Sequence, residues 1–150
     1  MIRVAINGYG RIGRSVLRAL YESGAREWVQ VVAINEPADS KTMAHLTRYD
    51  STHGRFPGTV SVSEDSLTIN GDDIAIVHEK DLSALPWGQH GVDVVLECSG
   101  TFTDRVTAEQ HISSGAKRVL FSQPADPSVD ATIVYGINHG ILTGNETIVS

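Results

Sequence analysis

The sequence predicts a Rossmann-type, doubly wound α/β domain, with a mostly parallel sheet and a short antiparallel excursion. Short β-branched apolar runs alternate with helical patterns, and a glycine-rich turn follows the first run directly. The chain has 150 residues, of which 41% are hydrophobic and 20% charged, an ordinary globular composition. We therefore expect residues 1–150 to form one nucleotide-binding domain.

The N-terminal part predicts a βαβ unit. Val4–Ile6 has the apolar character of a buried parallel strand. Arg11–Ser23 carries apolar residues at helical spacing, and Gly24 follows as a stop signal. The β-branched run Val29–Ile34 is the second strand.

The middle of the chain predicts one helix and a group of short strands. Ser40 is the expected cap of a helix that runs to about Tyr49. Apolar and polar residues then alternate over residues 60–76, with Asn70-Gly71 as a hairpin turn. These strands form the expected antiparallel excursion from the main sheet.

The C-terminal half restores the alternation of strands and helices, although no helix is evident between the last strands. We expect a strand at Val92–Cys98, a helix at Arg105–Ser114, and strands at Arg118–Phe121, Thr132–Tyr135 and Thr147–Val149.

Charge and composition exclude several classes of protein. The net charge of −6 argues against a general binder of nucleic acid or anionic membranes, which recruits excess Lys and Arg. No run resembles a signal peptide or a membrane span, and one cysteine cannot form an internal disulfide. The six histidines lack metal-ligand spacing. We expect a cytoplasmic protein without a metal site.

The motif Gly8-Tyr9-Gly10-Arg11-Ile12-Gly13 matches G-x-G-x-x-G and lies between a strand and a helix. In this context Gly8 permits the turn, Gly10 admits a pyrophosphate, and Gly13 allows close packing of the helix. The N-terminus of the helix offers free N–H groups to the anion. The alternative is a glycine-rich turn that binds nothing, which the strand–turn–helix context disfavours.

Glu36 lies just beyond the second strand, where dinucleotide-binding domains place a carboxylate against the adenosine ribose. A carboxylate there repels a 2′-phosphate, so NAD is expected over NADP, unless Glu36 is only a solvated loop residue. Ser99-Gly100-Thr101 and Ser122 follow strands whose carboxyl ends lie near the expected ligand crevice. Phe102 is as consistent with loop packing as with contact to an adenine ring.

No catalytic residue is expected in this chain. Cys98 ends an apolar run, where burial without a cationic neighbour raises a thiol pKa, so a structural role is favoured. His53 lies among polar loop residues and is expected to be exposed or locally hydrogen-bonded rather than a general base.

The chain resembles, over its whole length, the NAD-binding half of the glyceraldehyde-3-phosphate dehydrogenase superfamily. Tyr9 replaces the family's usual Phe. The segments that carry the resemblance are Val4–Arg14, Tyr49–Phe56, Leu96–Phe102 and Gly115–Val119.

Within the superfamily the chain is more similar to the erythrose-4-phosphate dehydrogenase branch than to the glycolytic branch. The hints are Ile34-Asn35-Glu36, the stretch His78–Trp87 and the stretch Asp130–Asn138.

The resemblance implies that Arg11 and Ile12 meet the pyrophosphate and nicotinamide regions of NAD, Glu36 the adenosine ribose, Lys80 the adenine side and Ser122 the nicotinamide side. Lys80 is commonly Arg in the family. Together with the residues expected from the glycine motif and the strand ends, the expected cofactor-binding residues are Asn7, Gly8, Gly10, Arg11, Ile12, Gly13, Glu36, Lys80, Ser99, Gly100 and Ser122.

The family's chemistry implies an NAD-dependent aldehyde dehydrogenase acting on a sugar phosphate. A cysteine thiolate attacks the aldehyde, hydride passes to NAD, and a thioester is left. Hydrolysis yields 4-phosphoerythronate in the erythrose branch, a step toward pyridoxal phosphate, whereas phosphate attack yields an acyl phosphate in the glycolytic branch.

The family's catalytic cysteine would follow Ser150, so the catalytic domain is expected to lie outside this chain. The parent enzyme is expected to be a homotetramer. Two interpretations stay open: the cofactor domain of such an enzyme, inactive alone, or an autonomous, non-catalytic NAD-binding module.

Overall fold

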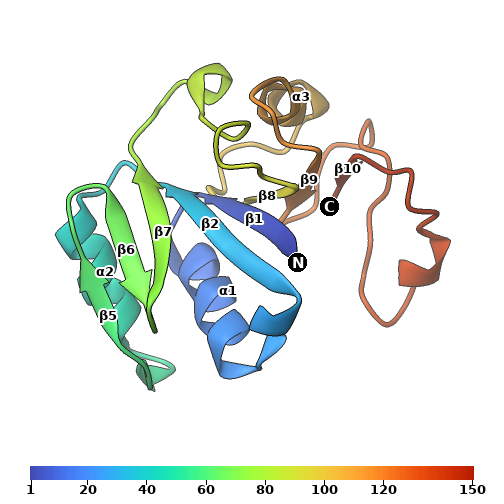
Figure 1. Ribbon diagram of the computed structural model, residues 1–150. Helices are drawn as coiled ribbons and strands as arrows, with labels where there is room; N and C mark the ends of the chain where they lie inside the picture. The colour runs from blue at the N-terminus through green and yellow to red at the C-terminus, as the bar shows by residue number, and fades with distance from the viewer.

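An eight-stranded sheet runs through the structure, a computed structural model that describes all 150 residues (Figure 1). The strands lie in the order β10-β9-β8-β1-β2-β7-β6-β5, and pairing is parallel from β10 to β7 and antiparallel from β7 to β5. The expected Rossmann-type fold is therefore confirmed. Its strands are β1 (Ile2–Asn7), β2 (Val29–Asn35), β5 (Val60–Val62), β6 (Ser66–Ile69), β7 (Asp72–Val77), β8 (Val94–Glu97), β9 (Arg118–Phe121) and β10 (Ile148–Val149).

The helices cover the two faces of this sheet. Figure 1 shows α1 and α2 on one face and α3 on the other. Each face has its own apolar core, with Leu17 and Met43 in the first and Ala108 and Trp87 in the second. The helices are α1 (Arg11–Glu22), α2 (Ser40–Arg48) and α3 (Arg105–Ser113), with short 3-10 helices at Ala25–Glu27, Leu82–Ala84 and His139–Ile141. No helix is long and apolar enough to cross a membrane.

The antiparallel strands are confirmed, and they continue the main sheet. The turn between β6 and β7 has Asn70 at φ 51° and Gly71 at φ 91°, as the Asn-Gly hairpin signal predicts. However, β7 also pairs in parallel with β2, because Ile74 and Ile76 alternate into the core that lies under α2. A small two-stranded sheet of β3 (Tyr49–Asp50) and β4 (Gly54–Arg55) lies apart, in the expected loop.

The cap of α2 is one residue earlier than predicted. Asp39 accepts a hydrogen bond from the Thr42 N–H at 3.0 Å, whereas the Ser40 hydroxyl donates to the carbonyl of Glu64. A carboxylate with two acceptor oxygens can bond both the Thr42 amide and the Thr42 hydroxyl, and it does so here.

The strand predicted at Thr132–Tyr135 does not form. Only an isolated bridge joins Ala131 to Val149. Backbone hydrogen bonds to residues 148–150 continue as far as Ile133, whose N–H donates to the Ser150 carbonyl at 2.7 Å. The Asn138 side chain then accepts from the Val134 N–H and donates to the Thr132 carbonyl, so local turn contacts end the pairing there. Val134 and Tyr135 are exposed, and only the short 3-10 helix at His139–Ile141 lies between β9 and β10, with no α-helix there.

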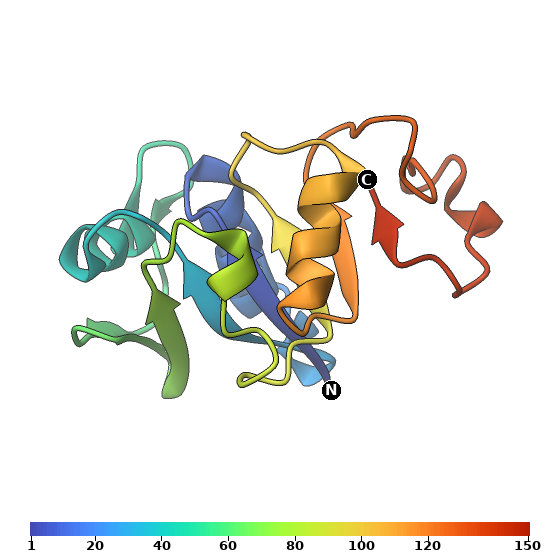
Figure 2. The same cartoon turned by 90° about the horizontal axis from the view of Figure 1, so that it is seen from above.

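The sheet reverses its winding at β1, which lies between β2 and β8. Helix α1 follows β1 and α3 follows β8 in the chain, and the two helices lie on opposite faces (Figure 2). Because these strands are parallel, their carboxyl ends share one edge of the sheet. A crevice at such an edge is where open α/β sheets bind ligands.

Candidate functional site

The glycine loop between β1 and α1 has the geometry that its motif predicts. Gly8 has φ +90°, and a Cβ there would lie 2.5 Å from the Ser99 Cα. A Cβ on Gly13 would lie 2.3 Å from the carbonyl oxygen of Gly8. A Cβ on Gly10 would meet no atom within 4 Å. Gly8 and Gly13 are thus required by packing, whereas Gly10 keeps the outer side of the loop open to an approaching group.

The first turn of α1 is open to an anion. Gly10 occupies the cap position, no side chain caps the turn, and no acidic residue lies in it. Arg11 and Ile12 are both exposed there. A helix N-terminus in this state presents unpaired N–H groups and a partial positive charge.

Glu36 joins the end of β2 to the glycine loop. Its carboxylate accepts a hydrogen bond from the Tyr9 N–H at 2.6 Å and another from the Ala38 N–H at 3.2 Å. The carboxylate therefore lies beside the turn that leads into α1. Its predicted contact with the adenosine ribose stays a prediction.

A cleft of about 200 Å³ opens at the carboxyl ends of β1, β2 and β8. It brings together four predicted residues, Asn7, Gly8, Lys80 and Ser99. Its other lining residues are Asn35, Pro37, Glu79, Leu82, Thr101 and Phe102.

The other seven predicted residues do not line this cleft: Gly10, Arg11, Ile12 and Gly13 belong to the glycine loop and the start of α1, Glu36 lies beside that loop, and Gly100 and Ser122 lie on the far side. Gly100 is exposed at φ +73° in the turn after Ser99. Ser122 lines a neighbouring, largely apolar groove that also contains Cys98, and its N–H donates to the Glu97 carbonyl at 3.0 Å. Ser122 is thus at the carboxyl end of β9, one strand away from the cleft.

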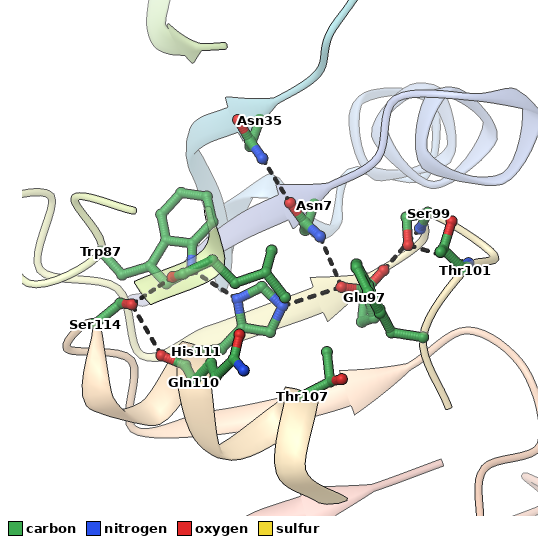
Figure 3. A network of polar contacts seen from close by, with 12 residues as sticks. Asn7, Asn35, Trp87, Glu97, Ser99, Thr101, Thr107, Gln110, His111 and Ser114 are labelled. Atoms are coloured by element: carbon green, nitrogen blue, oxygen red, sulfur yellow. Dashed lines mark hydrogen bonds and ion pairs between the residues drawn. The ribbon is translucent and has the colours of Figure 1, made fainter. Parts of the chain in front are cut away.

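Two residues that line the cleft, Asn7 and Asn35, belong to a buried network of polar side chains, which Figure 3 shows. Asn35 donates to Asn7 at 2.8 Å, and Asn7 donates to Glu97 at 2.7 Å. From the opposite side, Trp87 donates to His111 at 3.0 Å, and the His111 Nε2 lies 3.0 Å from the same Glu97 oxygen. All five side chains are buried.

Glu97 is the only acid of this network. Burial opposes its ionisation most strongly, but hydrogen bonds from His111, Ser99 and Asn7 together outweigh burial and lower its pKa. The network therefore holds a buried carboxylate at the carboxyl end of β8.

The surroundings of Cys98 and His53 do not favour a catalytic role for either residue. Burial raises the pKa of Cys98 to about 11, which opposes thiolate formation. His53 is exposed and its Nδ1 lies 3.1 Å from an Asp50 oxygen, as expected for a loop histidine. No three His, Cys, Asp or Glu side chains gather into a group that could hold a metal ion.

Sequence reasoning missed the roles of Asn35, Glu97 and His111. A signal was present, because Glu97 is an acid within the apolar run of β8, and a buried acid requires hydrogen-bond partners. The partners themselves carry no local signal, since Asn7 and His111 are brought to Glu97 only by the sheet and by α3.

The groups around the glycine loop fit a dinucleotide. An open glycine, an uncapped helix start and a carboxylate at the end of the neighbouring strand are the groups that receive a pyrophosphate and a ribose.

Comparison with known proteins also indicates an NAD-binding domain. Residues 2–105 match the family described as glyceraldehyde 3-phosphate dehydrogenase, NAD binding domain. The chain is 54% identical, over 149 residues, to the chromosomal and the plasmid glyceraldehyde-3-phosphate dehydrogenases of Cupriavidus necator. Each alignment covers 99% of this chain and 44% of the relative, so the chain spans less than half the length of these proteins.

Proposed function

The chain belongs to the glyceraldehyde-3-phosphate dehydrogenase family as an NAD-binding domain, and we propose that it holds NAD across the carboxyl ends of β1, β2 and β8. The observation that carries this placement is the open side of Gly10 at the uncapped start of α1. The pyrophosphate binds there, next to Arg11 and Ile12.

We assign the two ends of the cofactor from the strands on either side of the glycine loop. Glu36, at the end of β2, receives the adenosine ribose, and Lys80 lies on the adenine side of the cleft. Ser122, at the end of β9, lies toward the nicotinamide. The Glu36 carboxylate disfavours a 2′-phosphate by charge repulsion, so the domain selects NAD over NADP.

The parent protein is an NAD-dependent dehydrogenase of sugar-phosphate aldehydes in this proposal. When bound, NAD supplies the hydride acceptor for aldehyde oxidation. The residues of this chain bind and orient the cofactor. The nucleophilic thiolate comes from outside residues 1–150, since Cys98 is buried with a raised pKa.

Erythrose 4-phosphate is the proposed substrate, with 4-phosphoerythronate as product. This assignment is supported by the residues at Ile34–Glu36, His78–Trp87 and Asp130–Asn138, which are similar to the erythrose-4-phosphate branch. Glyceraldehyde 3-phosphate is the second candidate, because both relatives from Cupriavidus necator are named for it.

The two substrates are separated by one assay on the full-length protein. Both aldehydes are oxidised with NAD in the same preparation, with and without inorganic phosphate. The proposal predicts a higher kcat/KM for erythrose 4-phosphate and turnover without phosphate. A strong preference for glyceraldehyde 3-phosphate with an absolute phosphate requirement assigns the glycolytic reaction instead. Light scattering on the same sample tests the homotetramer that we propose for the parent.

A further inference from the structure

In the buried network, the hydrogen bonds at the Asn35 end can run in only one donor-to-acceptor direction. The Glu79 N–H donates to the Asn35 Oδ1 at 2.9 Å, and the Asn35 Nδ2 donates to the Glu79 carbonyl at 2.9 Å. This pair of backbone bonds sets which way the Asn35 amide faces. The Asn35 Nδ2 also donates to the Asn7 Oδ1, so Asn7 must present its own N–H group to Glu97.

The opposite end is fixed by Trp87. An indole N–H can only donate, so the Nδ1 of His111 accepts from it. The hydrogen of a neutral His111 ring is therefore on Nε2, which donates to the Glu97 Oε2. The His111 ring is fully buried, and its two nitrogens are both used in these contacts.

The two directions converge on Glu97, and a third donor reaches it from the cleft. The Ser99 N–H donates to the Glu97 Oε1 at 2.8 Å. Donors thus come from β1, from α3 and from the loop after β8, and none of the three can reverse. Only a group that accepts at both of its terminal atoms satisfies them, and an ionised carboxylate is such a group.

The loop that Glu97 holds is part of the cleft wall. Ser99 lines the cleft, and its backbone packs so closely on Gly8 that a Cβ on Gly8 would lie 2.5 Å from both the Cα and the N of Ser99. A shift of the Ser99 loop would therefore displace or loosen the glycine loop that it touches.

We propose that Glu97 is a positioning residue for nucleotide binding: its buried carboxylate fixes the Ser99 loop against the glycine loop by accepting the Ser99 N–H while Asn7 and His111 hold it from below. The inference rests on the proposed placement of NAD and adds a residue that does not itself contact the cofactor. A carboxamide of the same shape cannot replace it.

The test is Glu97→Gln in the 150-residue chain. The Gln oxygen can serve Asn7 and His111, which leaves its NH₂ group facing the Ser99 N–H. We expect the Kd for NAD to rise about tenfold. We also expect faster hydrogen exchange of the Ser99 amide. In a Trp28→Phe background, which leaves Trp87 as the only fluorophore of its kind, the Trp87 emission is expected to be unchanged because its contact to His111 is kept.

A destabilised control separates positioning from general stability. Leu67 is fully buried in β6, away from the cleft, and Leu67→Val lowers stability without touching the network. We expect the folded Leu67→Val chain to bind NAD as the wild type does. Folded Glu97→Gln with wild-type Kd and wild-type Ser99 exchange would overturn the proposal.

Two further outcomes are also decisive. If Glu97→Gln fails to fold, Glu97→Asp keeps the charge but retracts the carboxylate from the Ser99 N–H, and the same loss of affinity and amide protection is expected. If the wild-type chain shows no NAD binding in the same titration, the placement of NAD fails. Hydrogen exchange of the Ser99 amide then still shows whether Glu97 holds the loop. Unchanged exchange in the Glu97 variant would overturn the positioning role.

Discussion

The N-termini of α1 and α3 occupy equivalent positions in the fold, but only that of α3 is capped by a side chain. Each helix follows a parallel strand at the same edge of the sheet, α1 after β1 and α3 after β8. At α3, Asp104 caps the first turn by accepting from the Thr107 N–H and hydroxyl at 2.8 Å each. At α1, Gly10 stands at the cap position and no side chain bonds the first turn.

Two helix N-termini at the same edge of the sheet can therefore differ in whether their N–H groups are free to bind a ligand. The Asp104 carboxylate satisfies one of the first N–H groups of α3, that of Thr107, and its negative charge offsets the partial positive charge there. A glycine leaves the same groups of α1 available to an anion from outside. The sequence of the cap, rather than the fold, decides which helix start can receive a pyrophosphate.

The largest expected effect is that of Gly10→Val on NAD binding. The new Cβ meets no protein atom within 4 Å, so the domain should keep its stability while the side chain fills the space that the pyrophosphate needs. We expect NAD binding to disappear in a calorimetric titration, with an unchanged Tm. Retained affinity would show that the pyrophosphate does not bind at this loop.

A smaller effect is expected from Glu36→Ser on cofactor choice. Removal of the carboxylate beside the Tyr9 N–H takes away its repulsion of a 2′-phosphate. We expect the ratio of NAD to NADP affinity to fall by about tenfold, equivalent to about 1.4 kcal/mol.

Glu36→Gln is the matched variant, since it removes the charge and keeps an oxygen for the Tyr9 N–H. It should narrow the ratio in the same direction. A wild-type chain that prefers NADP would contradict the role given to Glu36.

At α3, Asp104→Ala should change stability and leave NAD binding alone. Loss of an N-cap costs about 1 kcal/mol of unfolding free energy. The Kd for NAD should stay within about twofold of the wild-type value, because Asp104 caps α3 and not the helix that is proposed to bind the pyrophosphate. A large loss of affinity would remove the distinction between the two helix ends.

The same variant has an expected pH dependence. Hydrogen bonds from the Thr107 backbone and side chain lower the pKa of Asp104 in the folded state. Its contribution is therefore present above the pKa of the unfolded chain and is lost as the pH falls through the folded one. Denaturation curves of wild type and Asp104→Ala should differ at pH 7 and converge in acid, below about pH 4. A constant difference at all pH values would exclude the carboxylate as the cap.

The smallest effect is expected at Cys98. Burial raises its pKa to about 11, so the thiol of the native chain should react slowly with a disulfide reagent at pH 8 and quickly after denaturation. The 150-residue chain should form no NADH from NAD and either sugar phosphate. Turnover that disappears in Cys98→Ser would assign a catalytic role to this residue.

The fold was predictable wherever local pattern and tertiary packing agree. The apolar run of β1, the glycine turn and the helical spacing of α1 all indicate the observed βαβ unit. Thr132–Tyr135 has similar strand propensity, but its pairing with β10 stops after Ile133 because the Asn138 side chain bonds the Thr132 carbonyl and the Val134 N–H. The parallel pairing of β7 with β2 also escaped prediction, since it depends on contacts between segments distant in the chain.

The candidate site divides in the same way. The positions of Gly8, Gly10, Gly13 and Glu36 in the fold were predictable because they depend on short spacing and on the strand that precedes each, while their contacts to NAD stay predictions. The convergence on Glu97 was not, because the direction of each hydrogen bond is fixed only when three separate parts of the chain meet.

A calorimetric titration of the wild-type chain with NAD shows whether a chain with an open helix start at Gly10 binds this dinucleotide. Saturable, weak binding of NAD is the expected result. The absence of any binding at millimolar NAD would contradict it.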